Sequence, residues 1–355
     1  MPPVPRLVVA PVFVRVLAVC TALCSLAACT AVSPAAGTKE AGAKGATSVG
    51  VAFSRGGRGD RSFNDSVGAG VDRAKAELGV SAKELSPNAA GSDLEEILRL
   101  LAETGHNPVL AVGFFYAQPL AKVAPAFPRT QFVIIDDATV KLPNVTNVVF
   151  REEQASYLVG AAAALKSATG RIGFVGGVQT PPQEKFLAGY EAGARAVNPG
   201  IRLSSVFMSQ PPDFSGFSVP DKAQEAARGM YDGGADVVYH AAGASGLGVF
   251  QAAKAAGKWA IGVDVDQRKT VDAGLAGVIL TSATKQLDVA VLSIVRDAAA
   301  GRPINGVHEF GLKEGGVGYA TSGGELADIQ PRLEQLRKQI VSGEIKVPVR
   351  PAESR

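Results

Sequence analysis

The stretch of this chain with the clearest chemical potential is Ser54–Gly70, SRGGRGDRSFNDSVGAG, which follows a short apolar run. Phe63 offers a flat aromatic face, and Asn64 beside it can donate and accept hydrogen bonds at once. A ring and an amide in this arrangement suit a nucleobase, because bases stack on aromatic side chains. Two plainer interpretations stay open: Phe63 packs in the core, and Asn64 caps the helix that carries Val67.

Two aspartates and one lysine stand at the ends of other apolar runs. Asp264 ends the run AIGVD, and Asp136 ends FVIID in the same way. A carboxylate at such a position accepts charge-assisted hydrogen bonds from both hydroxyls of a sugar diol. Lys285, which follows VILTSAT, could donate to the same sugar and balance the charge. A surface ion pair is the alternative, and Asp266 is close enough in sequence to compete with Asp264.

The elements that must position these residues alternate along the chain. Helical periodicity separates nearly every pair of short apolar runs, which predicts parallel sheets with helices on both faces. The length of the chain suggests two such sheets, and open α/β sheets bind ligands at the carboxyl ends of their strands. We expect strands at residues 49–53, 109–113, 132–136, 145–150, 172–175, 203–207, 237–241, 259–263 and 278–282.

The first residues have the features of a targeting segment. Two arginines precede an apolar run that is too short to span a bilayer, and Leu26-Ala27-Ala28-Cys29 closes it. Because this tetrapeptide resembles the bacterial lipobox, we predict a lipoprotein signal peptide over residues 1–28 and lipidation of Cys29. An ordinary signal peptide with a chance cysteine is the alternative. Residues 29–47 are small and polar, which predicts a flexible tether.

Composition and missing motifs argue against several classes of protein. The net charge is only +3, with both signs scattered, so a nucleic-acid surface is not expected. The other two cysteines are removed with the signal peptide, which leaves the mature chain without a disulfide or a cysteine-based metal site. The three histidines lack metal-ligand spacing, and there is neither a G-x-S-x-G elbow nor a P-loop. We therefore expect a binding protein with no cofactor, not an enzyme.

Six segments resemble the basic membrane protein (BMP) family of substrate-binding lipoproteins, which includes purine-nucleoside receptors of ABC transporters. They occur in the order and spacing of that family: GDRSFND (59–65), FVIIDD (132–137), RIGFVGG (171–177), DVVYHAAGASGLGVFQAA (236–253), WAIGVDVDQ (259–267) and FGLKEGGVGYA (310–320). The resemblance implies an α/β type I periplasmic-binding-protein fold, with two parallel-sheet lobes, a ligand cleft and three crossovers.

The same resemblance assigns ligand contacts. It implies a second aromatic on the opposite face of the base, for which Phe217 is the match and Phe214 a close competitor. Gly243, in HAAGASG, matches a position where backbone approaches the ligand, with a plain helix-entry turn as the alternative. The roles proposed above for Phe63, Asn64, Asp136, Asp264 and Lys285 match family ligand positions as well.

Ser54 departs from the family pattern. The family places an aspartate nine residues before the first stacking phenylalanine, and this chain has Ser54 there. A carboxylate only accepts hydrogen bonds at neutral pH, whereas a hydroxyl both donates and accepts. The sequence therefore predicts an altered or relaxed choice of base.

The resemblance also sets the expected organisation and partners. We predict lobe 1 at residues 48–151 and 268–303, lobe 2 at 152–267 and 304–323, and a C-terminal helix and tail at 324–355. The expected function is capture of a nucleoside, with purine preferred, by a monomeric protein at the outer face of the cell membrane. Its partners would be an ABC permease with its ATPase, and the membrane through the lipid on Cys29. The alternatives are a sugar or small signalling molecule bound by the same fold, a structural or host-contact lipoprotein, and a nucleoside-processing enzyme.

Overall fold

The computed structural model describes residues 47–302 and 305–352. The predicted signal peptide, Cys29 and all but the last residue of the predicted tether lie outside the described residues. Within the described ranges, no helix is both long enough and apolar enough to cross a membrane.

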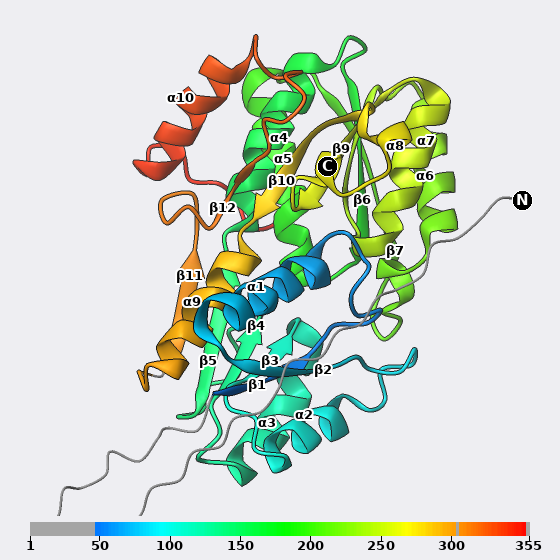
Figure 1. The fold of residues 1–355 in the computed structure, drawn as a ribbon. Coiled ribbons are helices and arrows are strands. Elements are labelled where there is room, and N and C mark those ends of the chain that lie inside the picture. Colours follow the sequence, from blue (N-terminus) through cyan, green and yellow to red (C-terminus); the bar gives the residue numbers. More distant parts are fainter. Residues whose placement is uncertain (1–46, 303–304, 353–355) are drawn as a thin grey trace, which may run out of the picture. The chain divides into compact units, whose positions relative to one another are not determined.

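The first sheet contains six parallel strands in the order β11-β5-β4-β3-β1-β2 (Figure 1). Its central strands β3 and β4 consist of VLAV and FVII, and every residue in them is buried because helices cover both faces. The strands are β1 Ser48–Ala52, β2 Ser81–Leu85, β3 Val109–Val112, β4 Phe132–Ile135, β5 Val145–Phe150 and β11 Gly306–Phe310; the helices beside them are α1 Phe63–Leu78, α2 Leu94–Glu103, α3 Ala117–Val123 and α9 Leu287–Ala299.

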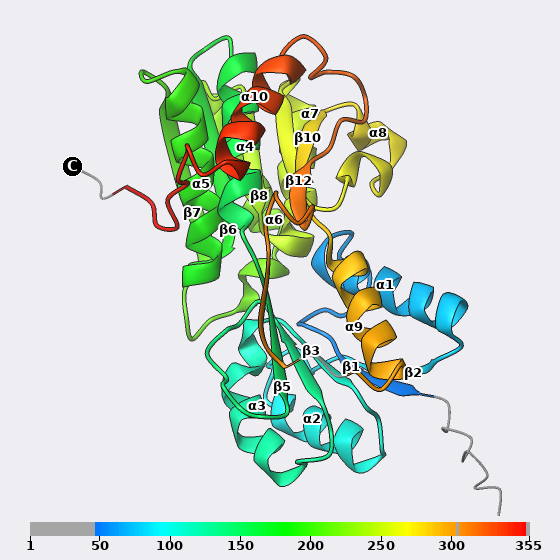
Figure 2. The ribbon, with the colours of Figure 1, turned by 90° about the vertical axis from the view of Figure 1, so that its left-hand side faces the viewer.

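The second sheet also contains six strands, in the order β12-β10-β9-β8-β6-β7, and only β12 runs antiparallel to its neighbour. Figure 2 shows the two sheets one above the other, each with its own helices. The strands are β6 Arg171–Val178, β7 Arg202–Ser209, β8 Val237–Ala241, β9 Trp259–Asp264, β10 Ile279–Lys285 and β12 Val317–Tyr319; the helices are α4 Glu152–Lys166, α5 Pro181–Val197, α6 Pro220–Asp232, α7 Gly246–Ala256, α8 Ala273–Ala276 and α10 Gln330–Val341.

The chain passes between the two sheets three times. The crossovers lie between β5 and α4, between β10 and α9, and between β11 and β12. The predicted lobe boundaries are wrong in two places. Strand β10 pairs with β9, so residues 279–285 belong to lobe 2, and β11 pairs with β5, so residues 306–310 belong to lobe 1. The crossovers therefore follow strand ends, where the chain leaves one sheet.

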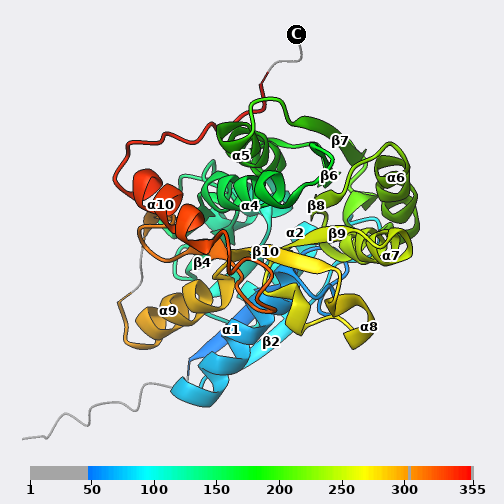
Figure 3. The same cartoon turned by 90° about the horizontal axis from the view of Figure 1, so that it is seen from above.

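Two close helix pairs stiffen the lobes. Helices α1 and α9 lie side by side in Figure 3, and a Cβ at Gly70 would stand only 2.7 Å from the carbonyl oxygen of Asp288. Helices α4 and α5 approach still more closely, since Cβ atoms at Gly160, Gly189 and Gly193 would each collide with a backbone carbonyl of the partner helix. Glycine at these positions permits backbone-to-backbone packing.

The C-terminal helix α10 packs on α4 of lobe 2. Leu333, Leu336 and Ile340 are buried, as expected for one apolar stripe of an amphipathic helix. The helix predicted between residue 324 and the tail is thus present.

Candidate functional site

A cavity of about 190 Å³ opens where the carboxyl ends of the two sheets meet. Both lobes contribute to its wall. It is lined by all eight residues predicted from the sequence as ligand contacts: Ser54, Phe63, Asn64, Asp136, Phe217, Gly243, Asp264 and Lys285. These positions are spread over more than 200 residues of sequence, and the fold brings them into one site.

The loop between β1 and α1 is held by its own polar side chains. The carboxylate of Asp60 accepts hydrogen bonds from the backbone N–H groups of Ser62, Asn64 and Asp65, so Asp60 satisfies the exposed donors at the start of α1. The alternative interpretation, in which Asn64 caps this helix, is excluded because Ser62 is the N-cap residue. Asn64 lies inside α1, and its Oδ1 accepts from the backbone N–H of Ser54, at 3.0 Å. Asn64 thereby fixes the loop across the cavity wall.

Aromatic rings form the end of the cavity next to Ser54. Phe114 and Phe115 follow β3 and belong to the cavity wall, and the hydroxyl of Tyr116 donates to the carbonyl of Phe53, which fastens this turn to β1. Phe115 meets Phe217 edge to face, with ring centroids 6.1 Å apart. The cavity therefore has phenylalanines from both lobes at one end.

Phe217 is placed by two glycines. Its ring lies against Gly177 of β6, where an added Cβ would come within 2.4 Å of ring carbons. Gly243 has a φ of +53° and passes close to the backbone of Phe217. Phe214, the competing position, does not line the cavity but packs edge to face on Phe115, at 5.0 Å between centroids. The structure thus puts Phe217 on the cavity wall, whereas Phe214 packs against Phe114 and Phe115.

Asp136 and Asp264 are both held in left-handed backbone conformations. Their φ angles are +67° and +64°, values that residues other than glycine rarely adopt. Asp136 directly follows β4, and Asp264 ends β9. Such conformations cost of order 1–3 kcal/mol and concentrate at functional sites.

Lys285 joins the two lobes through a buried charge cluster. Its Nζ lies 2.6 and 2.7 Å from the two carboxylate oxygens of Asp136 and 3.1 Å from Glu152. Burial disfavours the charge on Lys285, but the carboxylates around it outweigh this effect and raise its pKa. Burial raises the pKa of Asp136, and the ammonium group on both of its oxygens opposes that rise. The alternative of a surface ion pair is not what the structure shows: Lys285 forms a buried ion pair, and its partner is Asp136, not Asp264.

Asp264 has a neutral partner. Its carboxylate accepts a hydrogen bond from the hydroxyl of Ser62, in the lobe 1 loop. Burial raises the pKa of Asp264 to about 6, with Lys285 and the Ser62 hydroxyl acting in the opposite direction. Asp266 does not line the cavity and pairs with Lys269 and Ser322. Of the two candidates, Asp264 is the one that faces the site.

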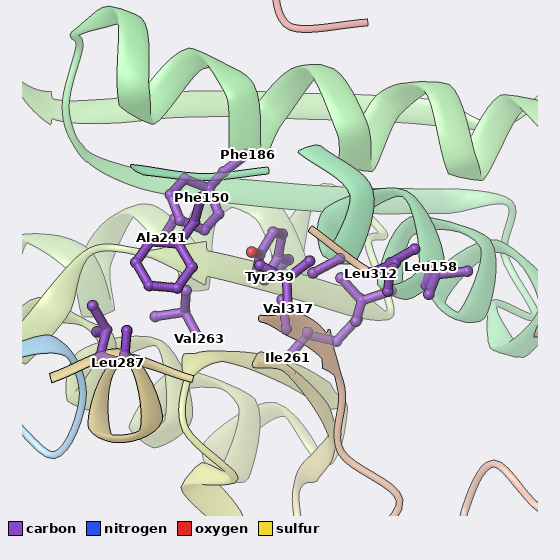
Figure 4. Packing of buried hydrophobic residues seen from close by; sticks show 14 of the residues in the cluster. Phe150, Leu158, Phe186, Tyr239, Ala241, Ile261, Val263, Leu287, Leu312 and Val317 are labelled. Carbon is purple, nitrogen blue, oxygen red and sulfur yellow. The ribbon is translucent and has the colours of Figure 1, made fainter. Parts of the chain in front are cut away.

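The floor of the cavity is continuous with the hydrophobic core. Phe186, Ala241 and Val263 line the cavity and also belong to the main apolar cluster, where they lie near Phe150 (Figure 4). A rigid, packed floor keeps the polar groups above it at fixed positions.

Several cavity-lining residues were missed by the sequence analysis, above all Arg55, Phe114, Phe115 and Gln183. An aromatic pair directly after an apolar strand, as in VGFFY, was a usable signal for Phe114 and Phe115. Gln183 had no such signal, because a glutamine in the first turn of a helix is ordinary. Among the described residues, no group of three or more His, Cys, Asp or Glu side chains could hold a metal ion.

The family model of PnrA-like ABC transporter substrate-binding proteins matches residues 47–351. The chain belongs to this family. The resemblance found in the six sequence segments is thereby confirmed. The family consists of solute-binding proteins of ABC transporters rather than enzymes.

Similar proteins agree with this placement. A CD4+ T-cell-stimulating antigen of Listeria monocytogenes is 34% identical over 314 residues, which cover 83% of this chain and 86% of that protein. The ABC transporter nucleoside-binding protein BmpA of Lactococcus lactis is 31% identical over 307 residues, which cover 81% of this chain and 85% of that protein. A solute-binding protein of an ABC transporter from Aeropyrum pernix superposes with a TM-score of 0.76 at 30% identity, over 86% of this chain and 94% of that chain. The type I periplasmic-binding-protein fold is confirmed.

Proposed function

We propose that this protein captures a nucleoside, with purine preferred, between its two lobes and delivers it to an ABC importer. The observation that carries the proposal is the combination of groups in one cavity. Phenylalanines from both lobes offer faces for a base, and Asp264 at the end of β9 offers a carboxylate for a ribose diol. The name of the Lactococcus relative, a nucleoside-binding protein, supports the same ligand class.

Capture works by closure of the lobes around the ligand. A ligand stabilises the closed state only through contacts that the open state lacks, and a shift from 1:99 to 99:1 takes about 5.5 kcal/mol. Stacking contributes roughly 1–3 kcal/mol per ring, and hydrogen bonds to a charged group contribute about 1.5–3 kcal/mol each. Two stacked rings and a diol on Asp264 together reach the required range.

The proposal includes a lipid anchor on Cys29 and a monomeric receptor at the extracytoplasmic face of the cell membrane. The permease and its ATPase would receive the ligand from the closed form. The lipobox-like segment supports the anchor, and a relative in Pyrococcus furiosus that is 32% identical over 348 residues is described as a lipoprotein. Mass spectrometry of the mature N-terminus tests the anchor: diacylated Cys29, with palmitate among its chains, is expected, and an unmodified or differently cleaved terminus would contradict it.

The base is selected at the end of the cavity where Ser54 and the aromatic turn meet. Ser54 is buried there beside Gly113 and Phe115. A hydroxyl tolerates both donors and acceptors on a base edge, so the choice of base should be relaxed. Replacing Ser54 by aspartate should favour bases that present a donor at that edge. An unchanged ranking of purine and pyrimidine nucleosides in Ser54→Asp would show that Ser54 does not select the base.

The ligand itself is tested by native mass spectrometry of the purified protein, followed by calorimetric titration with nucleosides, free bases, ribose and galactose. Tight binding of nucleosides over ribose and galactose is expected. Tighter binding of a free sugar than of nucleosides would contradict the proposal and would indicate a sugar receptor of the same fold. Release of free base during incubation with a nucleoside would instead indicate an enzyme.

A further inference from the structure

Gln183 stands out among the polar residues of the cavity. It is the third residue of α5, and one helical turn later Phe186 lies on the same side of the helix. Phe186 is buried in the cavity floor, and Gln183 lines the cavity as well. The start of α5 therefore presents a side-chain amide to the space where the ligand would lie.

The amide oxygen of Gln183 is enclosed by protein but accepts no hydrogen bond from the described residues. A buried acceptor without a donor is unfavourable, because it has lost its water and gained nothing in exchange. A few other side chains share this condition, including His240, Tyr190 and Glu153, but none of them lines the cavity. In the part of the chain that the structure describes, Gln183 is the one cavity-lining residue with such an unsatisfied atom.

The position of Gln183 separates it from the sugar-binding carboxylate. Helix α5 follows β6, and β6 lies two strands from β9, which carries Asp264. Adjacent strands are about 4.8 Å apart, so the two strand ends are separated by about 10 Å. Gln183 and Asp264 therefore belong to different elements of the cavity wall.

We propose that Gln183 is a specificity residue that accepts a hydrogen bond from a hydroxyl or amino group of the ligand. This inference rests on the proposed nucleoside function and adds a polar contact beyond the two rings and the carboxylate. Because protein covers the amide oxygen while the cavity is empty, the side chain has to turn toward the ligand, and the oxygen then gains its missing donor. A ligand without a donor at that position would leave the oxygen unsatisfied and would bind less tightly.

The test compares Gln183→Met, which keeps the length of the side chain, with Gln183→Glu, which keeps an acceptor. Gln179→Met is the matched control, because Gln179 is exposed, bonds to Gln210 and does not line the cavity. Affinities are measured for intact nucleosides, for their 2′-, 3′- and 5′-deoxy forms, and for a purine riboside without an exocyclic amine. Unfolding midpoints confirm that each variant is folded.

We expect Gln183→Met to weaken binding about 5- to 10-fold, with Gln183→Glu and Gln179→Met near wild type. For the one analogue that lacks the hydrogen-bond donor to Gln183, Gln183→Met and wild type should bind with equal affinity. That analogue identifies the ligand group that donates to Gln183. An equal loss for every analogue, or no loss while the wild type binds nucleosides, would overturn the role of Gln183 alone. Failure of the wild type to bind any nucleoside would overturn the proposed function and this inference together.

Discussion

Asp136 and Asp264 occupy equivalent places in the two lobes but have opposite surroundings. Each stands at the carboxyl end of a central strand, with a positive φ that turns its side chain toward the cavity. Asp136 has the ammonium group of Lys285 on both oxygens, whereas Asp264 has only the hydroxyl of Ser62. Both carboxylates contact the opposite lobe, but Asp136 is paired with a cation there, whereas Asp264 meets a neutral hydroxyl and keeps its charge unpaired.

The largest effect is expected from Lys285→Met, which leaves the buried Asp136 without its cation, while Glu152 keeps its ion pair with Lys185. Removing one member of a buried ion pair typically costs 3–5 kcal/mol of stability. Urea unfolding should show a loss of about that size. The matched control is Lys166→Met, which breaks the exposed pair with Asp328 and should cost less than about 1 kcal/mol. Equal losses of stability in the two variants would show that the buried Lys285–Asp136 pair contributes no more than an exposed ion pair.

Asp264→Asn should act on binding rather than on folding. Its partner Ser62 is neutral, so no charge is stranded when the carboxylate becomes an amide. Loss of charge-assisted hydrogen bonds to a diol should lower nucleoside affinity by about 10- to 100-fold. Calorimetric titration measures the affinity. For 2′,3′-dideoxynucleosides, which lack the diol, Asp264→Asn and wild type should have the same affinity. If Asp264→Asn lost as much stability as Lys285→Met, Asp264 would be as important for folding as Asp136, and the difference proposed between the two aspartates would be wrong.

Phe63→Ala tests the ring that lies between the two aspartate regions. Ser62, the residue before it, bonds to Asp264, and the ammonium of Lys285 lies 5.2 Å from the centroid of Phe63. Loss of one stacking face should weaken nucleoside binding by about tenfold or more. Phe214→Ala, which removes a ring behind the cavity wall, is the control and should change affinity less. Full affinity in Phe63→Ala would exclude stacking on this ring.

The pKa of Asp264 predicts a smaller effect that depends on pH. Because this pKa is raised to about 6, the carboxylate is mostly ionised at pH 7 and mostly protonated at pH 5. A protonated carboxyl loses its charge-assisted acceptor capacity, so nucleoside affinity should fall by up to about tenfold between pH 7 and pH 5. Asp264→Asn should show a flatter profile over that range. If the affinity of Asp264→Asn fell as much between pH 7 and pH 5 as that of the wild type, a group other than Asp264 would be titrating.

Much of the fold was predictable because the central strands are uniformly apolar. Strand β2, SAKEL, was missed, since it is a polar edge strand with no fully buried residue. The lobe assignment failed at β10 because periodicity identifies a strand but not the sheet it joins, and it failed at β11 because residues 306–310 were not predicted as a strand. Pairing depends on contacts between distant segments, such as β11 with β5.

For the site, the side chains at strand ends were predictable from their types, but their partners were not. The sequence placed Lys285 near a carboxylate, yet only the fold shows that Asp136 takes it. Phe115 had a sequence signal in the aromatic pair after β3, but the fold is needed to show that it meets Phe217 and that Gln183 lines the same cavity. Their position depends on how α5 and the turn after β3 pack, which no local pattern encodes.

The backbone contact between α4 and α5 has a mechanical consequence. Gly160, Gly189 and Gly193 allow these helices to touch along their backbones, so the two helices should move together as a rigid body. Helix α4 begins at Glu152, which contacts Lys285, and helix α5 carries Gln183 on the cavity wall. We therefore expect a displacement of α5 by a bound molecule to move the start of α4, where the chain crosses between the lobes.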